Sequence, residues 1–239
     1  KLIPLYDKFL RHVYGMGPVT AGYICALVDF ERCPKPSNLR TFCGLGIDNV
    51  TGRADRARRR VEGETVAPKL RYNAALKKKL YLCLNSMRKA KRHGDNKYMQ
   101  HWRNKKATAL AEFDHLCRAK ERGELDATAL ARLARMASRE GGANGFADHK
   151  GRRKATDLLI EDIYIVGRTM AGLPVFPDWY AAKLGYKHGT DRIQVSSPTM
   201  LTFEQAIETI GNFGRMDPPV GLVDDPNEVD SDEDNGDDL

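Results

Sequence analysis

Several features that would mark a membrane or nucleotide-binding protein are missing from this sequence of 239 residues. No segment approaches the ~20 consecutive apolar residues of a membrane-spanning helix, and the first residues do not resemble a signal peptide. P-loop, dinucleotide-binding and Ser-His-Asp patterns are also absent. We therefore expect a cytoplasmic protein with no membrane partner and no nucleotide cofactor.

Metal-binding patterns are missing as well. The five cysteines are odd in number and widely spaced, without a Cys-x-x-Cys pair, and the six histidines are scattered. A zinc site needs ligand pairs at short, regular spacing. The sequence predicts reduced thiols, most of them small core residues, and no metal or cofactor held by these residues.

Positive charge is abundant but unevenly distributed. The formal net charge is +7, yet residues 224–239 contain nine acids and no Lys or Arg, which leaves a net charge of +16 on residues 1–223. Such an excess attracts polyanions, because Lys and Arg neutralise phosphates and release their counterions. Nucleic acid is the favoured partner, and a DNA-bound protein would be nucleoid-associated. We also expect the acidic tail to compete with DNA for the basic body.

Hydrophobic spacing predicts a mainly α fold, a helix-hairpin-helix followed by a long-helix bundle, and composition predicts a disordered acidic C-terminal tail. Because the first residue is Lys1, we expect the chain to begin inside a longer product. A flexible hinge is expected at 141–145, with Asp148 capping the next helix and Ser37 capping an earlier one. The expected helices are 5–14, 18–28, 38–43, 69–92, 96–120, 126–139, 148–170 and 202–212.

A glycine turn joins the first two expected helices, and a proline then occupies a favoured first position of the second helix. Glycines allow positive φ and let a phosphate approach the main chain, while free N–H groups at the start of the second helix face the anion. The turn therefore binds phosphate without reading bases. The residues predicted to bind a DNA backbone here are Gly15, Met16, Gly17, Val19 and Thr20.

Packing around this turn is also predicted. Met16 should seat the turn in the core, Ala21 should allow close helix contact, and Val13, Ile24 and Leu27 should face inward. An ordinary helical hairpin with a glycine turn is the alternative interpretation, and the proline that begins the second helix lacks one N–H donor. The basic composition of the body favours phosphate binding.

Five arginines lie within residues 53–60, a run that contains one acid. This density favours phosphate contact over a merely solvated surface. The helix that follows adds lysines, which can lie along the same backbone and make binding salt-dependent. The DNA-binding residues predicted in these two segments are Arg53, Arg56, Arg58, Arg59, Arg60, Lys77 and Lys78.

Two further groups of residues each allow two interpretations. The basic residues of 150–154 either contact phosphate or form a solvated face. The aromatic residues among the basic ones either stack on unpaired bases or pack in the core, and packing is favoured for most of them. These aromatic residues are Tyr72, Tyr81, Tyr98 and Trp102.

These patterns divide the chain into four regions. Residues 1–66 hold the helix-hairpin-helix and the basic loop, and residues 67–174 form a basic helical region. Residues 175–223 form an irregular C-terminal region, and residues 224–239 form the disordered acidic tail.

The order of the motifs resembles one family. Residues 13–21 (Val-Tyr-Gly-Met-Gly-Pro-Val-Thr-Ala), residues 37–46, and Thr51-Gly52 before a basic stretch are similar to the C-terminal transposase domain of the insertion-sequence "one-ten", "one-sixteen" and "nine-oh-two" transposases. The resemblance covers Leu5 to about Arg103. The later basic helix, followed by Gly-Leu-Pro at 172–174, is similar to that of archaeal and phage-type relatives.

That resemblance implies DNA recombination. The family joins a RuvC-like domain, whose acids bind a divalent metal, to a helical domain with a nucleophilic serine, and its members are guided by a structured RNA. The serine position corresponds to Thr51, whose methyl group crowds its hydroxyl. The RuvC-like part is not among these residues. The partners expected are DNA, a structured guide RNA and further copies of the chain.

The sequence thus predicts a DNA-binding, transposase-like protein of a mobile element that acts in DNA transposition or recombination. DNA binding is inferred from the residues, and transposition from the resemblance alone. No complete active site is present in these residues, so whether the chain is an enzyme stays open. The alternative is a non-catalytic DNA- or RNA-binding protein derived from a transposase.

Overall fold

The structure is a computed structural model that describes residues 3–46, 72–89, 96–176 and 197–211. Within these ranges the regular elements are helices, and one isolated antiparallel bridge joins Val175 to Thr199. The predicted mainly α class is confirmed. None of the helices in these ranges is long and apolar enough to cross a membrane. The predicted acidic tail, 224–239, lies outside the described residues.

The helices follow one another along the chain without an intervening sheet in the ranges described. In order they are α1 (Ile3–Lys8), the short 3-10 helix η1 (Leu10–His12), α2 (Pro18–Leu27), α3 (Pro36–Phe42), α4 (Ala74–Lys89), α5 (Lys97–Glu121), α6 (Ala127–Ala137), α7 (Gly142–Met170) and α9 (Phe203–Ile210).

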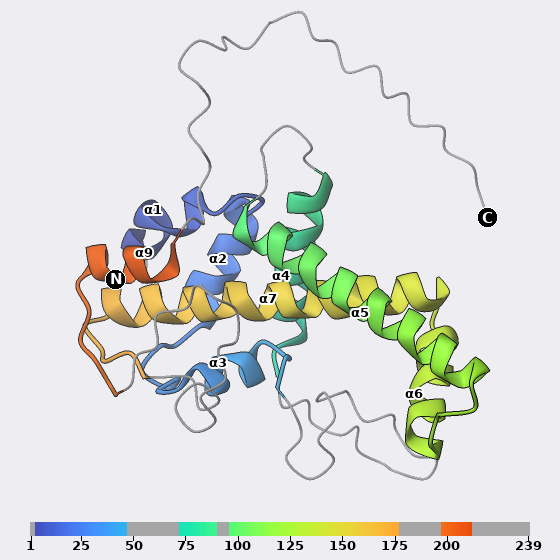
Figure 1. Ribbon diagram of the computed structural model, residues 1–239. Coiled ribbons are helices and arrows are strands. Elements are labelled where there is room, and N and C mark those ends of the chain that lie inside the picture. The colour runs from blue at the N-terminus through green and yellow to red at the C-terminus, as the bar shows by residue number, and fades with distance from the viewer. Residues whose placement is uncertain (1–2, 47–71, 90–95, 177–196, 212–239) are drawn as a thin grey trace, which may run out of the picture.

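Helix α7 is the central element, with α5 crossing it along much of its length (Figure 1). Helices α1, α3, α4, α6 and α9 also pack against α7. One hydrophobic core runs from Leu5 to Ile210 and includes residues of the predicted regions 1–66, 67–174 and 175–223. These three regions therefore fold together around α7.

Two glycines let other elements approach α7 closely. A Cβ on Gly151 would lie 2.7 Å from the Trp102 carbonyl oxygen on α5. A Cβ on Gly167 would lie 2.1 Å from Cζ of Phe30, whose ring is buried. Only glycine leaves room for both neighbours, so these positions fix how deeply α5 and the segment after α2 sit on α7.

One side of α7 carries a row of polar groups that holds residues 30–46, and we call it the polar seam. Asp157 and Glu161 bind the guanidinium of Arg40 at 2.8 and 3.0 Å. The other members bond to main-chain oxygens, because the Arg153, Tyr164 and Arg168 side chains donate to the carbonyls of Leu45, Pro34 and Phe30, each at 2.7 Å. The seam ties α3 and its flanking loops to α7.

The other side of α7 buries a carboxylate against α5. The Tyr98 hydroxyl donates to Asp162 at 2.6 Å, and the Lys97 amine lies 2.5 Å from the same carboxylate. Burial raises the pKa of Tyr98, and the negative charge of Asp162 and its hydrogen bond raise it further. The buried charge is thereby paired and hydrogen-bonded, as burial requires.

The first predicted helix is wrong in its extent. The expected helix 5–14 is α1 up to Lys8, and then η1, because Phe9 leaves the helical conformation with φ −134°. Its predicted apolar residues are nevertheless buried: Leu5, Phe9, Leu10 and Val13. The second helix of the hairpin is confirmed at Pro18–Leu27.

The expected hinge at 141–145 is also wrong. Gly141 adopts φ +75° as the N-cap and α7 begins directly after it at Gly142, so Asp148 lies inside the helix. There it pairs with Lys106 at 3.5 Å instead of capping. Ser37 likewise lies inside α3, which begins at Pro36. The caps that the structure shows at the starts of α6 and α9 are Asp126 and Thr202, the first residues of the expected helices 126–139 and 202–212, and each accepts a main-chain N–H group.

Gly167→Ala should lower the free energy of unfolding by about 1–3 kcal/mol, because the new methyl group overlaps the Phe30 ring. Gly22→Ala is the matched control, since nothing lies within 4 Å of its Cβ and it is also helical. It should raise the free energy of unfolding by about 0.5–1 kcal/mol. Urea unfolding measures both, and equal effects would contradict the close approach at Gly167.

Candidate nucleic-acid interface

The predicted glycine turn exists, but its two glycines do different things. Gly15 has φ +74°, which favours glycine. A Cβ there would lie 2.7 Å from Met87 Cγ and 2.8 Å from the Cys83 carbonyl oxygen, so Gly15 faces α4. The expectation that Gly15 leaves space for a phosphate is therefore wrong, because that space holds α4.

Gly17 is the glycine that faces outward. Nothing lies within 4 Å of its would-be Cβ, and its φ of −72° is ordinary. It is the N-cap of α2 without a side-chain cap, and the first turn contains no acid. Val19 is 60 % exposed, whereas Thr20 is nearly buried. The start of α2 thus keeps uncapped N–H groups at a surface that an anion can approach.

Packing around the turn follows the prediction with one exception. Val13, Met16, Ala21 and Ile24 are buried, which seats the turn in the core. Leu27 was expected to face inward but is 37 % exposed. It lies one helical turn after Tyr23, which is also 37 % exposed.

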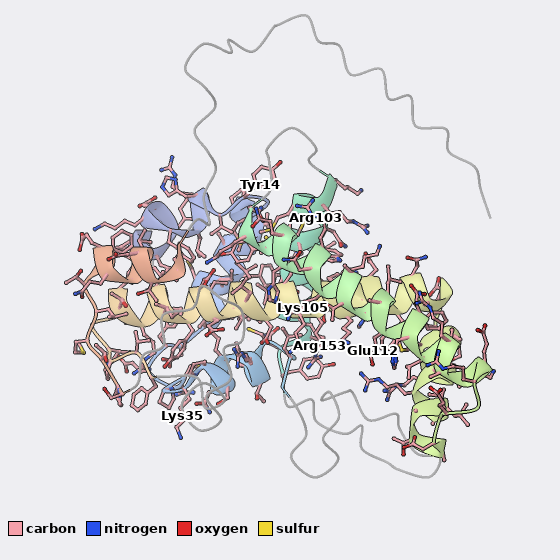
Figure 2. All side chains as sticks on the ribbon, in the orientation of Figure 1. Tyr14, Lys35, Arg103, Lys105, Glu112 and Arg153 are labelled. Atoms are coloured by element: carbon pink, nitrogen blue, oxygen red, sulfur yellow. The ribbon has the colours of Figure 1, made fainter. Side chains whose placement is uncertain are left out.

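A second basic surface forms where α4, α5 and α7 meet, and we call it the loop-base cluster. Its residues come from Tyr72 just before α4, from the first half of α4, from the first half of α5 and from residues 152–154 of α7. Figure 2 shows two of them, Lys105 and Arg153, near each other below the middle of α5. The cluster consists of Tyr72, Lys77, Tyr81, Lys105, Arg152, Arg153 and Lys154.

The cluster lies where residues 47–71 leave and rejoin the described fold. The Asn73 N–H donates to the Phe42 carbonyl at 2.8 Å, which holds the two ends of this segment together. A Cβ on Gly44 would lie 2.7 Å from the Tyr72 ring, so the two ends are also in close contact. Arg153 adds a hydrogen bond to the Leu45 carbonyl at 2.7 Å.

Cations of α3, α5 and α7 lie near Lys154. Its pKa is lowered, first because neighbouring atoms displace water from the amine; the charge of Asp157 opposes this shift, and the cations Arg40, Arg153 and Lys105 add to it. The residue is still exposed, so the loss of water is partial. A bound anion would relieve this repulsion.

Cations lie over the two tyrosine rings of the cluster. The Lys77 amine is 4.7 Å from the Tyr72 ring centre, and the Arg152 guanidinium is 5.0 Å from that of Tyr81. Partial burial raises the pKa of Tyr81, and the charges of Arg153 and Arg152 oppose that shift. Both rings orient cations at a half-buried surface.

Two of the four aromatic residues predicted either to stack on bases or to pack in the core do pack in the core. Tyr98 and Trp102 are 0 and 4 % exposed and pack in the core, so they cannot stack on bases. The basic residues of 150–154 do not oppose the dipole at the start of a helix, because α7 begins at Gly142 and they lie more than two turns inside it.

Other predicted site residues lie outside the described residues. These are Thr51 and the arginines Arg53, Arg56, Arg58, Arg59 and Arg60, all in 47–71. Lys78 is exposed on α4, one residue after Lys77 of the cluster. The turn contacts Cys83 and Met87 in the second half of α4, and the cluster lies at its first half, so the two predicted contact regions sit at opposite ends of one helix.

Lys105 of α5 is the part of the cluster that sequence reasoning missed. It lies 49 residues before Lys154 in the chain, and only the crossing of α5 over α7 brings them together. One signal was available, since residues 96–111 contain Lys and Arg but no acid. That run is typical of a surface from which negative charge is excluded.

Carboxylates do not gather as a catalytic centre in the part of the chain that the structure describes. No group of three or more His, Cys, Asp or Glu residues there could hold a metal ion. Asp29 accepts the N–H groups of Glu31 and Arg32 at 3.0 and 3.3 Å, which makes it a turn residue. Cys33, Cys43 and Cys83 are buried free thiols, and burial raises the pKa of Cys83 to about 12.

Comparison with known proteins gives no relative: no protein-family model, no curated protein and no solved structure matches the chain.

Gly15→Ala should lower the free energy of unfolding by at least about 2 kcal/mol, because positive φ and the overlap with α4 both oppose a methyl group. Gly17→Asp should leave the free energy of unfolding unchanged or raise it by roughly a few tenths of a kcal/mol, because Asp caps helices better than Gly does. Chemical unfolding compares the two. A large loss of stability in Gly17→Asp would show that Gly17 is not open.

Proposed function

We propose that this chain is a DNA-binding, transposase-like protein that acts in DNA transposition or recombination. It holds the DNA backbone through the start of α2 and through the arginine run 53–60. The observation that carries the proposal is the loop-base cluster, because it gathers cations from α4, α5 and α7 at the base of the segment that contains the five arginines.

Electrostatics supports this assignment. Residues 74–89 and 96–111 contain no acid, so the surface of α4 and the first half of α5 carries only positive formal charge. Phosphates that bind there release condensed counterions, and this release makes the affinity depend steeply on salt. The same contacts would not discriminate between base sequences.

The two contact regions suit a double helix. Helix α4 has 16 residues and so is about 24 Å long. The start of α2 lies beside its second half and the loop-base cluster beside its first half. The ten residues from Lys77 to Met87 rise about 15 Å, which is about four base-pair steps of duplex DNA. In the proposed complex the turn and the arginine loop would hold the backbone at points about this far apart.

The proposal assigns DNA holding to the described residues. In the family that the sequence resembles, metal-bound strand chemistry belongs to a RuvC-like domain, and a serine attacks the phosphate. Thr51 corresponds to that serine and is the catalytic candidate. A guide RNA and further copies of the chain would be partners in that activity.

A non-catalytic DNA- or RNA-binding protein derived from a transposase is the second candidate function. It is favoured by one observation, the threonine at the position of the family's serine. The added methyl group crowds the attacking hydroxyl without affecting phosphate contacts elsewhere. Binding assays alone would not separate the two functions, whereas strand transfer would.

The double variant Lys105→Ala with Lys154→Ala should bind duplex DNA more weakly. The slope of log K against log salt should become flatter by up to about 1.8, because each lost phosphate contact reduces the slope by ~0.9. Arg118→Ala with Lys120→Ala is the matched control, with the same charge change at the exposed far end of α5. Fluorescence anisotropy of labelled duplex across a salt series measures both pairs.

In the same series, Gly17→Asp should weaken binding without loss of stability, because its carboxylate occupies the position of a phosphate at the start of α2. Alanine at Arg53, Arg56, Arg58, Arg59 and Arg60 should flatten the slope further. If neither change alters affinity or slope, the assigned contact surface is wrong.

Thr51→Ser should increase, and Thr51→Val should abolish, a covalent link between protein and cleaved DNA. The hydroxyl oxygen attacks phosphorus, a phosphorus–oxygen bond of the DNA breaks, and the departing oxygen takes a proton. Denaturing gels of end-labelled DNA incubated with Mg²⁺ and the complete recombinase measure the product. DNA binding with no covalent product in any variant would identify the non-catalytic protein instead.

A further inference from the structure

One face of α2 is apolar and exposed, and of its residues only Val19 belongs to the proposed interface. The helix has no charged residue among its 10 residues. Its inner side, with Ala21 and Ile24, packs in the core. On its outer side Val19, Tyr23 and Leu27 follow at steps of four residues and are 60, 37 and 37 % exposed. A helix at the surface of a folded protein normally turns polar residues to water.

Helix α4 extends this apolar face. The two helices run antiparallel, because Gly15 before α2 lies against Met87 near the end of α4, and Tyr23 lies 5.2 Å from the Lys79 amine near its start. Leu82 follows Lys79 by about one turn and is 44 % exposed. We call Val19, Tyr23, Leu27 and Leu82 the α2–α4 stripe.

The charge on the two helices that carry the stripe has one sign, and the nearest acids in sequence, Asp29 and Glu31, follow α2 beyond Leu27. Lys78, Lys79 and Lys89 lie on α4, and residues 18–27 and 74–89 contain no acid. A complementary partner is therefore a short segment with apolar side chains and adjacent carboxylates. An anionic phosphate alone would leave the apolar side chains uncovered.

We propose that the α2–α4 stripe is the docking site for this chain's own C-terminal segment, residues 218–239. That segment contains Val220, Leu222 and Val223, followed at once by nine acids and by no Lys or Arg. The three apolar side chains cover the stripe, and the acids that follow lie beside the lysines of α4. The segment itself lies outside the described residues.

The segment can reach the stripe. Helix α9 begins at Phe203, whose ring centre is 5.4 Å from the Lys8 amine of α1, and ends at Ile210, whose carbonyl accepts a hydrogen bond from Lys97 of α5; α1 in turn packs on α2. Two neighbouring helices are separated by about 8–10 Å each. The nine residue steps from Gly211 to Val220 span up to about 30 Å, which covers that separation.

The size of the stripe favours this occupant over a second copy of the chain. A stable interface between folded proteins buries about 800 Å² on each partner, from some 20–30 residues. Four large side chains on two helices offer much less. A tethered segment gains from its high effective concentration and needs no large area.

Docking does not depend on the proposed function, but it has a consequence for it. The acids would lie next to Lys78, one of the predicted DNA-binding residues. The tail would then compete with DNA while bound at one position on α4, and its charge would not be spread over the whole basic surface. Failure of DNA binding would leave the docking inference intact, because the test below contains no nucleic acid.

The test places a photo-crosslinking benzoylphenylalanine at Tyr23 of the full chain, with the same residue at Leu130 of α6 as control, since Leu130 is 42 % exposed. Irradiation should join position 23 to residues 218–239 within one chain, as mass spectrometry of the monomer band reads out, and should not do so from position 130. Circular dichroism checks the fold. Val19, at 60 % exposure, is the substitute position if the Tyr23 variant fails to fold.

Serine at Val220, Leu222 and Val223 should abolish the crosslink from position 23, because the acids alone cannot cover the stripe. A crosslink that survives these changes would overturn apolar docking. A crosslinked dimer would assign the stripe to a second copy, and either no adduct or equal adducts from both positions would also overturn the proposal.

Discussion

The pairing of Arg40 with Asp157 and Glu161 is the interaction on which the rest of the arrangement depends. It joins α3 to the middle of α7 at 2.8 and 3.0 Å, with all three side chains largely removed from water. Removing one member would leave unpaired charge at a partly buried position, which costs more than the pair itself contributes. Main-chain carbonyls extend this seam to Phe30 and Leu45, so residues 30–46 are held along one side of α7.

That constraint places the candidate interface. Because the seam fixes Leu45 beside Arg153, the segment that follows residue 46 must leave the fold next to the basic turn of α7. The bond between Asn73 and Phe42 brings the same segment back to that point. The two described ends of the segment that contains the five arginines, at residues 46 and 72, are therefore held beside the loop-base cluster.

Helix α4 contributes to three different surfaces, one at each end and one on its outer side. Its first half meets the loop-base cluster, and its second half supports the glycine turn through the contact of Gly15 with Met87. Its outer side joins α2 in the apolar stripe. The helix contributes to all three surfaces because it lacks acids and alternates buried leucines with exposed lysines.

The sequence by itself determined the helical class, the buried apolar residues of the hairpin apart from Leu27, and the basic body, since these follow from local spacing and composition. Only the tertiary structure decided that Gly15 faces α4, that α7 starts at Gly142 and that Lys105 joins Lys154. Each depends on contacts between residues far apart in the chain. A local pattern identifies a turn or a cation, but packing decides what it faces.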